Sequence, residues 1–233
     1  MAAGNLSRGR GRGYRRRRPL PAVIVLCVLA VAAVIVWLRV LDKGSGNVAV
    51  KCDPPRTAPV ATSGQPPTTL GQSLAPDALD RTVPAAPAQT LVHVVNASTQ
   101  RGQAAEITEA LRQLGFSQVA PPANDPLYLS GDLTCRAQIR FGQQGTAAAR
   151  TLSLVEPCAE LVKDNRQDAT VDLAIGKRFD NLRPKTEARR LLEQLNKFSL
   201  EHPEAQGGLQ ANPAAQPDLD PTQISAARQA TCT

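Results

Sequence analysis

The first pattern along the chain is an unbroken apolar run near its amino-terminal end. Residues 22–38 carry no charged side chain, and Leu20 together with the Arg39–Leu41 flank extends the apolar stretch to residues 20–41. About 20 apolar residues in a helix cross the roughly 30 Å of hydrocarbon in a bilayer. The pattern therefore predicts a single transmembrane helix over residues 20–41.

A cleaved signal peptide is the alternative interpretation of this run, because Ala30-Val31-Ala32 resembles a signal-peptidase site. Cleavage there would leave Ala33–Leu38 on the mature protein, and the run is long for a signal sequence, so we expect an uncleaved anchor. Seven arginines lie in residues 8–18, whereas the other side offers Lys43 and Lys51. This asymmetry places the basic tail, residues 1–19, in the cytoplasm and the rest of the protein outside the membrane.

Residues 42–90 show no sustained hydrophobic period and are rich in proline, glycine, alanine, threonine and serine. This composition predicts a linker. Regular patterning begins afterwards, with a β-branched strand at Leu91–Val95 and a turn at Asn96–Arg101. Apolar residues at helical spacing then predict a helix from Gly102 to the stop at Gly115, followed by a strand at Phe116–Ala120.

A second strand–helix–strand unit follows a proline-containing loop at 121–132. Ala137, Ile139 and Phe141 alternate with polar residues and predict a half-buried strand. A helix from about Thr146 is ended by Pro157, and strands are expected at 158–163 and 170–175.

Two such units predict an α/β fold, a small two-layer sandwich of strand–helix–strand units over residues 91–182, behind the single transmembrane helix. An amphipathic helix is expected within residues 183–202. We expect residues 203–233 to form a mostly disordered tail with a short final helix, for which Asp220-Pro221 supplies the N-cap and first residue.

Composition narrows the possible functions. The net charge of +7 arises entirely from the seven arginines of the first 18 residues, because the remaining chain holds 20 basic and 20 acidic residues. This distribution excludes a basic nucleic-acid-binding domain as the first interpretation. Aromatic residues make up only 3% of the chain, which argues against a module that stacks sugars on tryptophan or tyrosine.

Four cysteines lie outside the apolar run, namely Cys52, Cys135, Cys158 and Cys232. An even number in an exported segment predicts two disulfides with three possible connectivities, and the wide spacing does not fit a zinc site. Cys135 and Cys158 each begin a strand of one strand–helix–strand unit, so we expect them to pair if those strands are neighbours. Cys52–Cys232 then follows by elimination.

The string Asn96–Ala104 resembles the N-G-[ST]-x-x-x-G-x-A turn that follows the first strand of the LytR_C domain, the carboxy-terminal module of LytR-CpsA-Psr envelope proteins. Matches continue at Ala110–Phe116, Ile139–Gly142 and Ala148–Leu152, so the resemblance covers about residues 90–182. Two positions depart from the pattern: Ala97 replaces a glycine, and Arg178 stands where the family places an aspartate. The resemblance implies association with Gram-positive or actinobacterial cell walls and assigns no catalytic chemistry to this module.

Two groups of residues are candidates for binding a ligand or partner. Asn96, Ser98, Arg101 and Gly102 lie at the start of a helix, where free N–H groups suit a phosphate or carboxylate; a capped turn is the favoured alternative. Arg136 and Arg140 share one strand face with Gln138 and could meet an anionic wall polymer, although a solvated sheet face is favoured. His93 lies inside a strand, where we expect it to be packed.

No arrangement of nucleophile, base or metal ligands stands out in the sequence, so no catalytic residue, metal or cofactor is predicted. We expect a membrane-anchored, extracytoplasmic, non-catalytic protein that supports cell envelope integrity by binding an envelope protein or a wall component, and not a nucleic acid. The alternatives are a wall-polymer attachment factor of the phosphotransferase type and a glycan-binding module.

Overall fold

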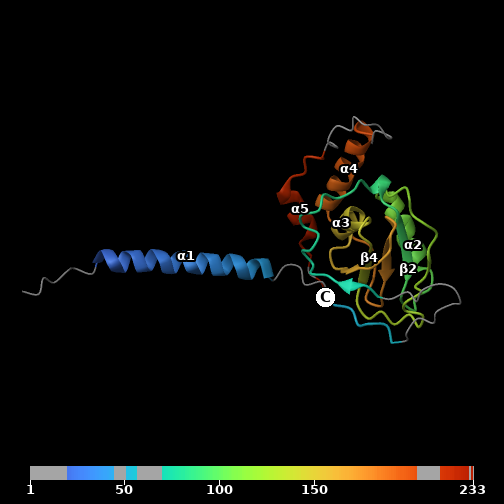
Figure 1. Cartoon of the computed structure of the whole chain (residues 1–233), viewed down its shortest axis with the longest axis horizontal. Helices are drawn as coiled ribbons and strands as arrows, with labels where there is room; N and C mark the ends of the chain where they lie inside the picture. The colour runs from blue at the N-terminus through green and yellow to red at the C-terminus, as the bar shows by residue number, and fades with distance from the viewer. Residues whose placement is uncertain (1–19, 45–50, 57–69, 204–215, 231, 233) are drawn as a thin grey trace, which may run out of the picture. The chain divides into compact units, whose positions relative to one another are not determined.

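The computed structural model describes residues 20–44, 51–56, 70–203, 216–230 and 232, and Figure 1 traces the others in grey. The chain divides into two compact units, residues 1–44 and 45–233. The first unit contains helix α1 (Leu20–Gly44), whose side chains from Ile24 to Val36 are exposed. Within the described part of the chain, no helix is both long enough and apolar enough to cross a membrane. The basic tail lies outside the described residues.

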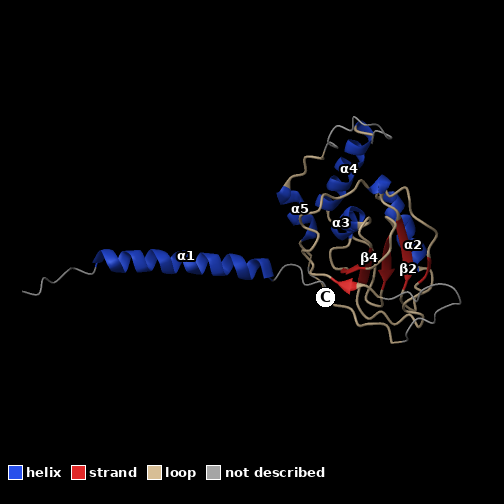
Figure 2. Cartoon of the chain, in the orientation of Figure 1, coloured by secondary structure: helices blue, strands red, loops and turns tan. Residues whose placement is uncertain are grey.

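The second unit is built on one six-stranded sheet, whose strands are red in Figure 2. The strands are β1 (Gln72–Ser73), β2 (Val92–Asn96), β3 (Ala123–Asn124), β4 (Ala137–Phe141), β5 (Glu160–Lys163) and β6 (Val171–Ile175). Their order across the sheet is β1-β5-β4-β6-β2-β3. The sheet is mixed, because β2 is parallel to β6 and β4 is parallel to β5, whereas β4 and β6 are antiparallel.

Helices α2 (Gln103–Gln113) and α3 (Thr146–Val155) cover one face of this sheet. Alternate strand residues such as Val94, Ile139 and Leu173 point to that face and pack with Leu111 of α2 and Leu152 of α3. All five side chains are completely buried, and each stabilises the fold by about 1.5–3 kcal/mol. The predicted α/β class is therefore confirmed, with both helices close to their expected bounds.

Further helices lie outside this layer. Helix α4 (Thr186–Glu201) and α5 (Pro221–Arg228) pack against each other and against α3, and η1 (Pro87–Gln89) packs against α4. Figure 1 shows α5 beside α4. The predicted N-cap of the last helix is confirmed, because the Asp220 side chain accepts a hydrogen bond of 2.8 Å from the backbone N–H of Thr222.

The structure differs from the expected organisation between residues 42 and 90. Residues 70–90, expected within the linker, pack on the domain, where β1 pairs with β5 and Leu79 is buried in the main core. Residues 51–56 also lie on the domain, because Cys52 is buried in a second apolar cluster on the sheet face opposite α2 and α3. Proline-rich composition predicts the absence of regular structure but does not predict whether a segment packs on a core.

The prediction of a strand at Phe116–Ala120 is wrong. Only one isolated bridge, between Val92 and Val119, forms there, and the short strand β3 begins at Ala123. Pro121 and Pro122 lie between the bridge at Val119 and the start of β3. Since proline lacks the N–H that a ladder requires, the pairing with β2 is interrupted at this point.

Candidate functional site

The carboxyl ends of β2 and β6 meet at one edge of the sheet. Asn96 of β2 is in register with Ile175 of β6, and the backbone N–H of Ala97 donates to the carbonyl of Ile175 at 2.9 Å. Two segments follow these ends side by side, the turn 97–102 and the loop 176–180. Ligands of α/β folds bind where strands end in this way, so this β2–β6 edge is the candidate functional site.

The turn at this edge uses its polar groups to hold its own conformation. Oδ1 of Asn96 accepts hydrogen bonds of 2.9 Å from the backbone N–H and from the hydroxyl of Ser98. Nδ2 of Asn96 donates to the carbonyl of Gln100 at 2.7 Å. These contacts form an Asx turn, in which the side chain takes the part of a backbone group. Asn96 and Ser98 are therefore structural residues of a capped turn.

Gly102 ends the turn in a left-handed conformation, with φ of +81°, that only glycine adopts without strain. The next side chain, Gln103, is buried and ties the turn to the neighbouring loop, because its Nε2 donates to the carbonyl of Phe179 at 2.8 Å. Arg101 precedes Gly102 and is exposed. The turn thus presents one cation to solvent from a rigid backbone.

Arg136 lies at the same edge, since its carbonyl accepts from the N–H of Gly176, but its guanidinium is engaged by the fold. Nε donates to Glu156 at 2.9 Å, Nη1 to Asp180 at 2.5 Å and Nη2 to the carbonyl of Asn181 at 2.7 Å. The guanidinium also stacks over the Phe179 ring, 4.7 Å from its centre. Arg136 therefore anchors the loop after β6.

The expectation that Gln138 and Arg140 lie on a solvated sheet face is wrong, because both side chains are almost fully buried. Nη1 of Arg140 lies 2.8 Å from Oδ2 of Asp125, and its Nε donates to Gln138 at 3.0 Å. A loop from residues 125–135 covers this face and carries Tyr128, whose ring lies 5.4 Å below the Arg140 guanidinium. Arg140 is consequently unavailable to a wall polymer.

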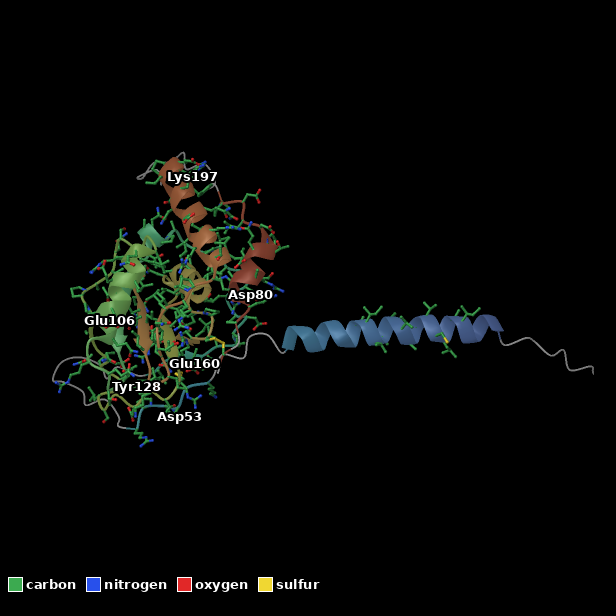
Figure 3. All side chains as sticks on the ribbon, turned by 180° about the vertical axis from the view of Figure 1, so that it is seen from behind. Asp53, Asp80, Glu106, Tyr128, Glu160 and Lys197 are labelled. Atoms are coloured by element: carbon green, nitrogen blue, oxygen red, sulfur yellow. A yellow bond between two sulfur atoms is a disulfide. The ribbon has the colours of Figure 1, made fainter. Side chains whose placement is uncertain are left out.

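The buried polar network continues to Glu160 on β5. This carboxylate accepts hydrogen bonds from Gln138 at 2.8 Å, from Ser73 at 2.6 Å and from the backbone N–H of Cys52 at 3.2 Å. Tyr128 donates from its hydroxyl to the carbonyl of Asp53 at 2.7 Å. Figure 3 labels Tyr128, Asp53 and Glu160, which lie together at one end of the unit.

Burial in the polar network and at the β2–β6 edge shifts the pKa values of Tyr128 and Glu156. Burial of the phenol raises the pKa of Tyr128 to about 12, against the smaller opposing effect of Arg140. Burial also raises the pKa of Glu156 above its ordinary value, and the hydrogen bond from Arg136 opposes this shift. Both shifts have structural causes.

All four predicted cysteines form disulfides, but the expected pairing is wrong. The bridges are Cys52–Cys135 and Cys158–Cys232, with Cα–Cα distances of 5.0 and 5.4 Å. The strands that follow Cys135 and Cys158 are indeed parallel neighbours. Cys135, however, packs with Cys52 on the sheet face away from the helices, and Cys158 is bridged to the end of the chain beyond α5. Adjacent strand starts fix proximity but not the direction of each side chain.

Two further charged clusters were not predicted from the sequence. Arg166 bonds to Asp164 at 2.7 Å and to Asp172 at 2.6 Å, and His93 lies 3.6 Å from Asp172. His93 is partly exposed and not packed as expected. The second cluster joins two buried arginines, Arg150 of α3 and Arg228 of α5, to Asp80. The members of the second cluster are distant in sequence, and in the first cluster only His93 is distant from the other three.

The mixed sheet, the capped turn after β2 and the anchored loop after β6 define an α/β domain of the LytR_C class. The family described as LytR cell envelope-related transcriptional attenuator matches residues 89–179. Over 160 residues the chain is 41% identical to the cell envelope integrity protein Cei of Mycobacterium tuberculosis, an alignment that covers 68% of this chain and 72% of Cei. The chain therefore belongs to the LytR_C-containing family that includes Cei.

A solved structure supports the same assignment. The chain is similar to the soluble domain of a conserved hypothetical secreted protein from Mycobacterium marinum, with 36% identity and a TM-score of 0.58. The similarity covers 71% of this chain and all of that domain. The family membership implied by the residues of the turn and strands is thus confirmed by sequence and by fold.

Proposed function

We propose that this protein is a single-pass envelope protein whose extracytoplasmic domain supports envelope integrity by binding a partner protein or wall component, without catalysis. The observation that carries the proposal is that polar side chains at the β2–β6 edge are hydrogen-bonded or ion-paired to other groups of the domain. Asn96 and Ser98 bond each other, and Arg136 is held by Glu156 and Asp180. Groups committed to holding a surface in one conformation suit recognition better than the proton transfers of catalysis.

The relationship to Cei supports the envelope part of this proposal, since Cei is named for cell envelope integrity. The anchor is assigned to the apolar run within α1, and the basic tail before it would lie on the cytoplasmic side. The two disulfides fit an exported domain, because such bridges persist in oxidising compartments.

In-cell photocrosslinking tests whether the edge binds. A photoreactive amino acid replaces Thr99, an exposed residue of the turn, and in a matched control it replaces Glu109, an exposed residue towards the other end of α2. We expect adducts with one envelope protein or wall fragment from position 99 and not from position 109. Equal adducts from both positions, or cleavage or transfer of a wall polymer by the purified protein, would contradict the proposal.

A further inference from the structure

Three exposed cations gather at the β2–β6 edge and have no acidic partner among the ion pairs of the described residues. Arg101 lies in the turn after β2, and Lys177 and Arg178 lie in the loop after β6. The two segments are joined directly by the hydrogen bond from Gln103 to the carbonyl of Phe179. We call Arg101, Lys177 and Arg178 the cationic triad.

The backbone that presents the triad is fixed. Lys177 donates its N–H to the carbonyl of Leu133 at 2.8 Å, and Arg178 donates to that of Cys135 at 3.2 Å. The next residue, Phe179, is buried in the core, with 2% of its surface exposed. A Cβ on Gly176 would lie only 2.2 Å from the carbonyl oxygen of Cys135, so the backbone of this loop packs directly against that of Cys135.

Acidic groups near the triad are mostly neutralised already. Asp180 pairs with Arg136 and Arg183, and Asp132 lies 3.8 Å from Arg56. Glu106 in the first turn of α2 is exposed and has no ion pair among the described residues. Glu106 is thus one carboxylate without an ion pair against three cations without one, and an excess of positive charge remains at this edge.

The shape of the edge decides which anion it suits. Two cavities of the described domain, one lined by residues around His93 and the other by residues around Gln72, include no residue of the triad, whose side chains are exposed. Separate cations on an open surface fit a ligand whose negative charges repeat along a chain. Insertion into a bilayer requires a larger apolar surface than Leu129, the single exposed large apolar side chain of the neighbouring loop.

We propose that the cationic triad binds a polyanionic wall polymer that carries repeating phosphodiester or carboxylate groups. The inference rests on the proposed binding function and names its ligand class. Arginine guanidinium groups bind phosphate and carboxylate oxygens through paired N–H donors, and Lys177 adds a point charge beside them.

Lysine acetylation followed by mass spectrometry tests the proposal in the full chain. This readout is local to Lys177, so binding of polyanions by the arginine-rich tail does not obscure it. We expect inorganic polyphosphate or polygalacturonate to slow acetylation of Lys177 by about threefold or more, and added salt to reverse the protection. Acetylation of Lys197, an exposed lysine of α4, serves as the internal reference and stays unchanged.

Two double variants distinguish protection that depends on the triad from protection that depends only on the net charge of the protein. Arg101→Gln combined with Arg178→Gln should abolish protection of Lys177, whereas Arg81→Gln combined with Arg112→Gln removes the same charge elsewhere and should leave protection intact. Unchanged Lys177 labelling, equal protection of Lys197, or protection only by phosphatidylglycerol vesicles overturns the proposal. These results leave a specific crosslink from position 99 standing, so failure of the ligand class is distinguishable from failure of the binding function.

Discussion

Among single residues, Arg136 has the clearest energetic role, because it neutralises a carboxylate that the fold buries. Glu156 is 4% exposed and accepts from Nε of Arg136 at 2.9 Å. Replacing Arg136 with methionine leaves that carboxylate buried without its ion partner. We expect the Arg136→Met change to lower the free energy of unfolding by about 3 kcal/mol near neutral pH, measured by urea denaturation.

The pH dependence of this loss has a definite sign. Burial already raises the pKa of Glu156 above its ordinary 4.5, and loss of Arg136 removes an opposing effect. A raised carboxyl pKa means that the folded state binds the proton more tightly, so stability is lost as pH rises through that pKa. The deficit of Arg136→Met should therefore shrink as pH falls towards 4.5, and Glu156→Gln in the same background should remove this trend. An equal deficit at every pH would contradict the assignment.

Tyr128 provides a second test at the residue scale. Its pKa is raised to about 12, so the folded state retains the phenol proton more strongly than the unfolded state, whose ordinary value is 10.0. The associated stability is complete below pH 10 and is lost as pH rises towards 12. Tyr128→Phe should flatten this alkaline decline and cost about 1 kcal/mol at neutral pH, through loss of the bond to Asp53.

At the scale of elements, the disulfides hold segments that the sheet cannot hold alone. Cys52–Cys135 spans 83 residues and fixes residues 51–56 against the buried polar network. We expect Cys52→Ser with Cys135→Ser to lower the free energy of unfolding by about 2–4 kcal/mol. Non-reducing peptide mapping should recover Cys52–Cys135 and Cys158–Cys232 peptides; a Cys135–Cys158 peptide would contradict the structure.

Two glycines at the β2–β6 edge are needed for different reasons, and alanine variants distinguish them. At Gly176 a Cβ meets the backbone carbonyl of Cys135 at 2.2 Å, so the loop must move. At Gly102 nothing lies within 4 Å, and the cost is only the left-handed φ of +81°. Thermal denaturation should show a loss of about 1–2 kcal/mol for Gly102→Ala and a larger loss for Gly176→Ala. The reverse order would show that the edge is not rigid.

The elements themselves were largely predictable from sequence because their signals are local. Apolar spacing and the stops at Gly115 and Pro157 define α2 and α3, and Asp220 marks the start of α5. The roles of Arg140 and Gln138 were not predictable, because their polar face is covered by residues 125–135 and by Cys52. Alternation along one strand shows that two faces differ but cannot show what a distant segment places over one of them.

The same limit applies to the candidate site. Asn96, Ser98, Arg101 and Gly102 are contiguous, and the sequence correctly placed them in one turn before a helix. Lys177 and Arg178 join them only because β6 lies parallel to β2 with Ile175 opposite Asn96. That strand order depends on the whole sheet, so the full edge could be assembled only from the structure.

At the scale of the whole molecule, the proposed membrane anchor rests on the apolar run within α1. Residues 22–38 carry no charge, and seven arginines precede them. High salt and alkaline carbonate disrupt charge interactions but do not release a helix buried in hydrocarbon. Its apolar side chains are more stable in the hydrocarbon than in water. We expect the protein to remain in the membrane fraction after washing with high salt or alkaline carbonate, with the globular domain open to protease added outside the cell.

A matched variant shows whether the apolar run is responsible for this retention. Replacing three apolar residues at its centre, Val28, Leu29 and Val31, with aspartate would place charges at the centre of the hydrocarbon core, where they cost most, and should release the protein from the membrane. The seven-arginine tail is intact in this variant, so release also shows that electrostatic attachment of the tail is insufficient. A mature amino terminus near Ala33 would instead identify the run as a cleaved export signal, and the domain would then act without a covalent tether to the membrane.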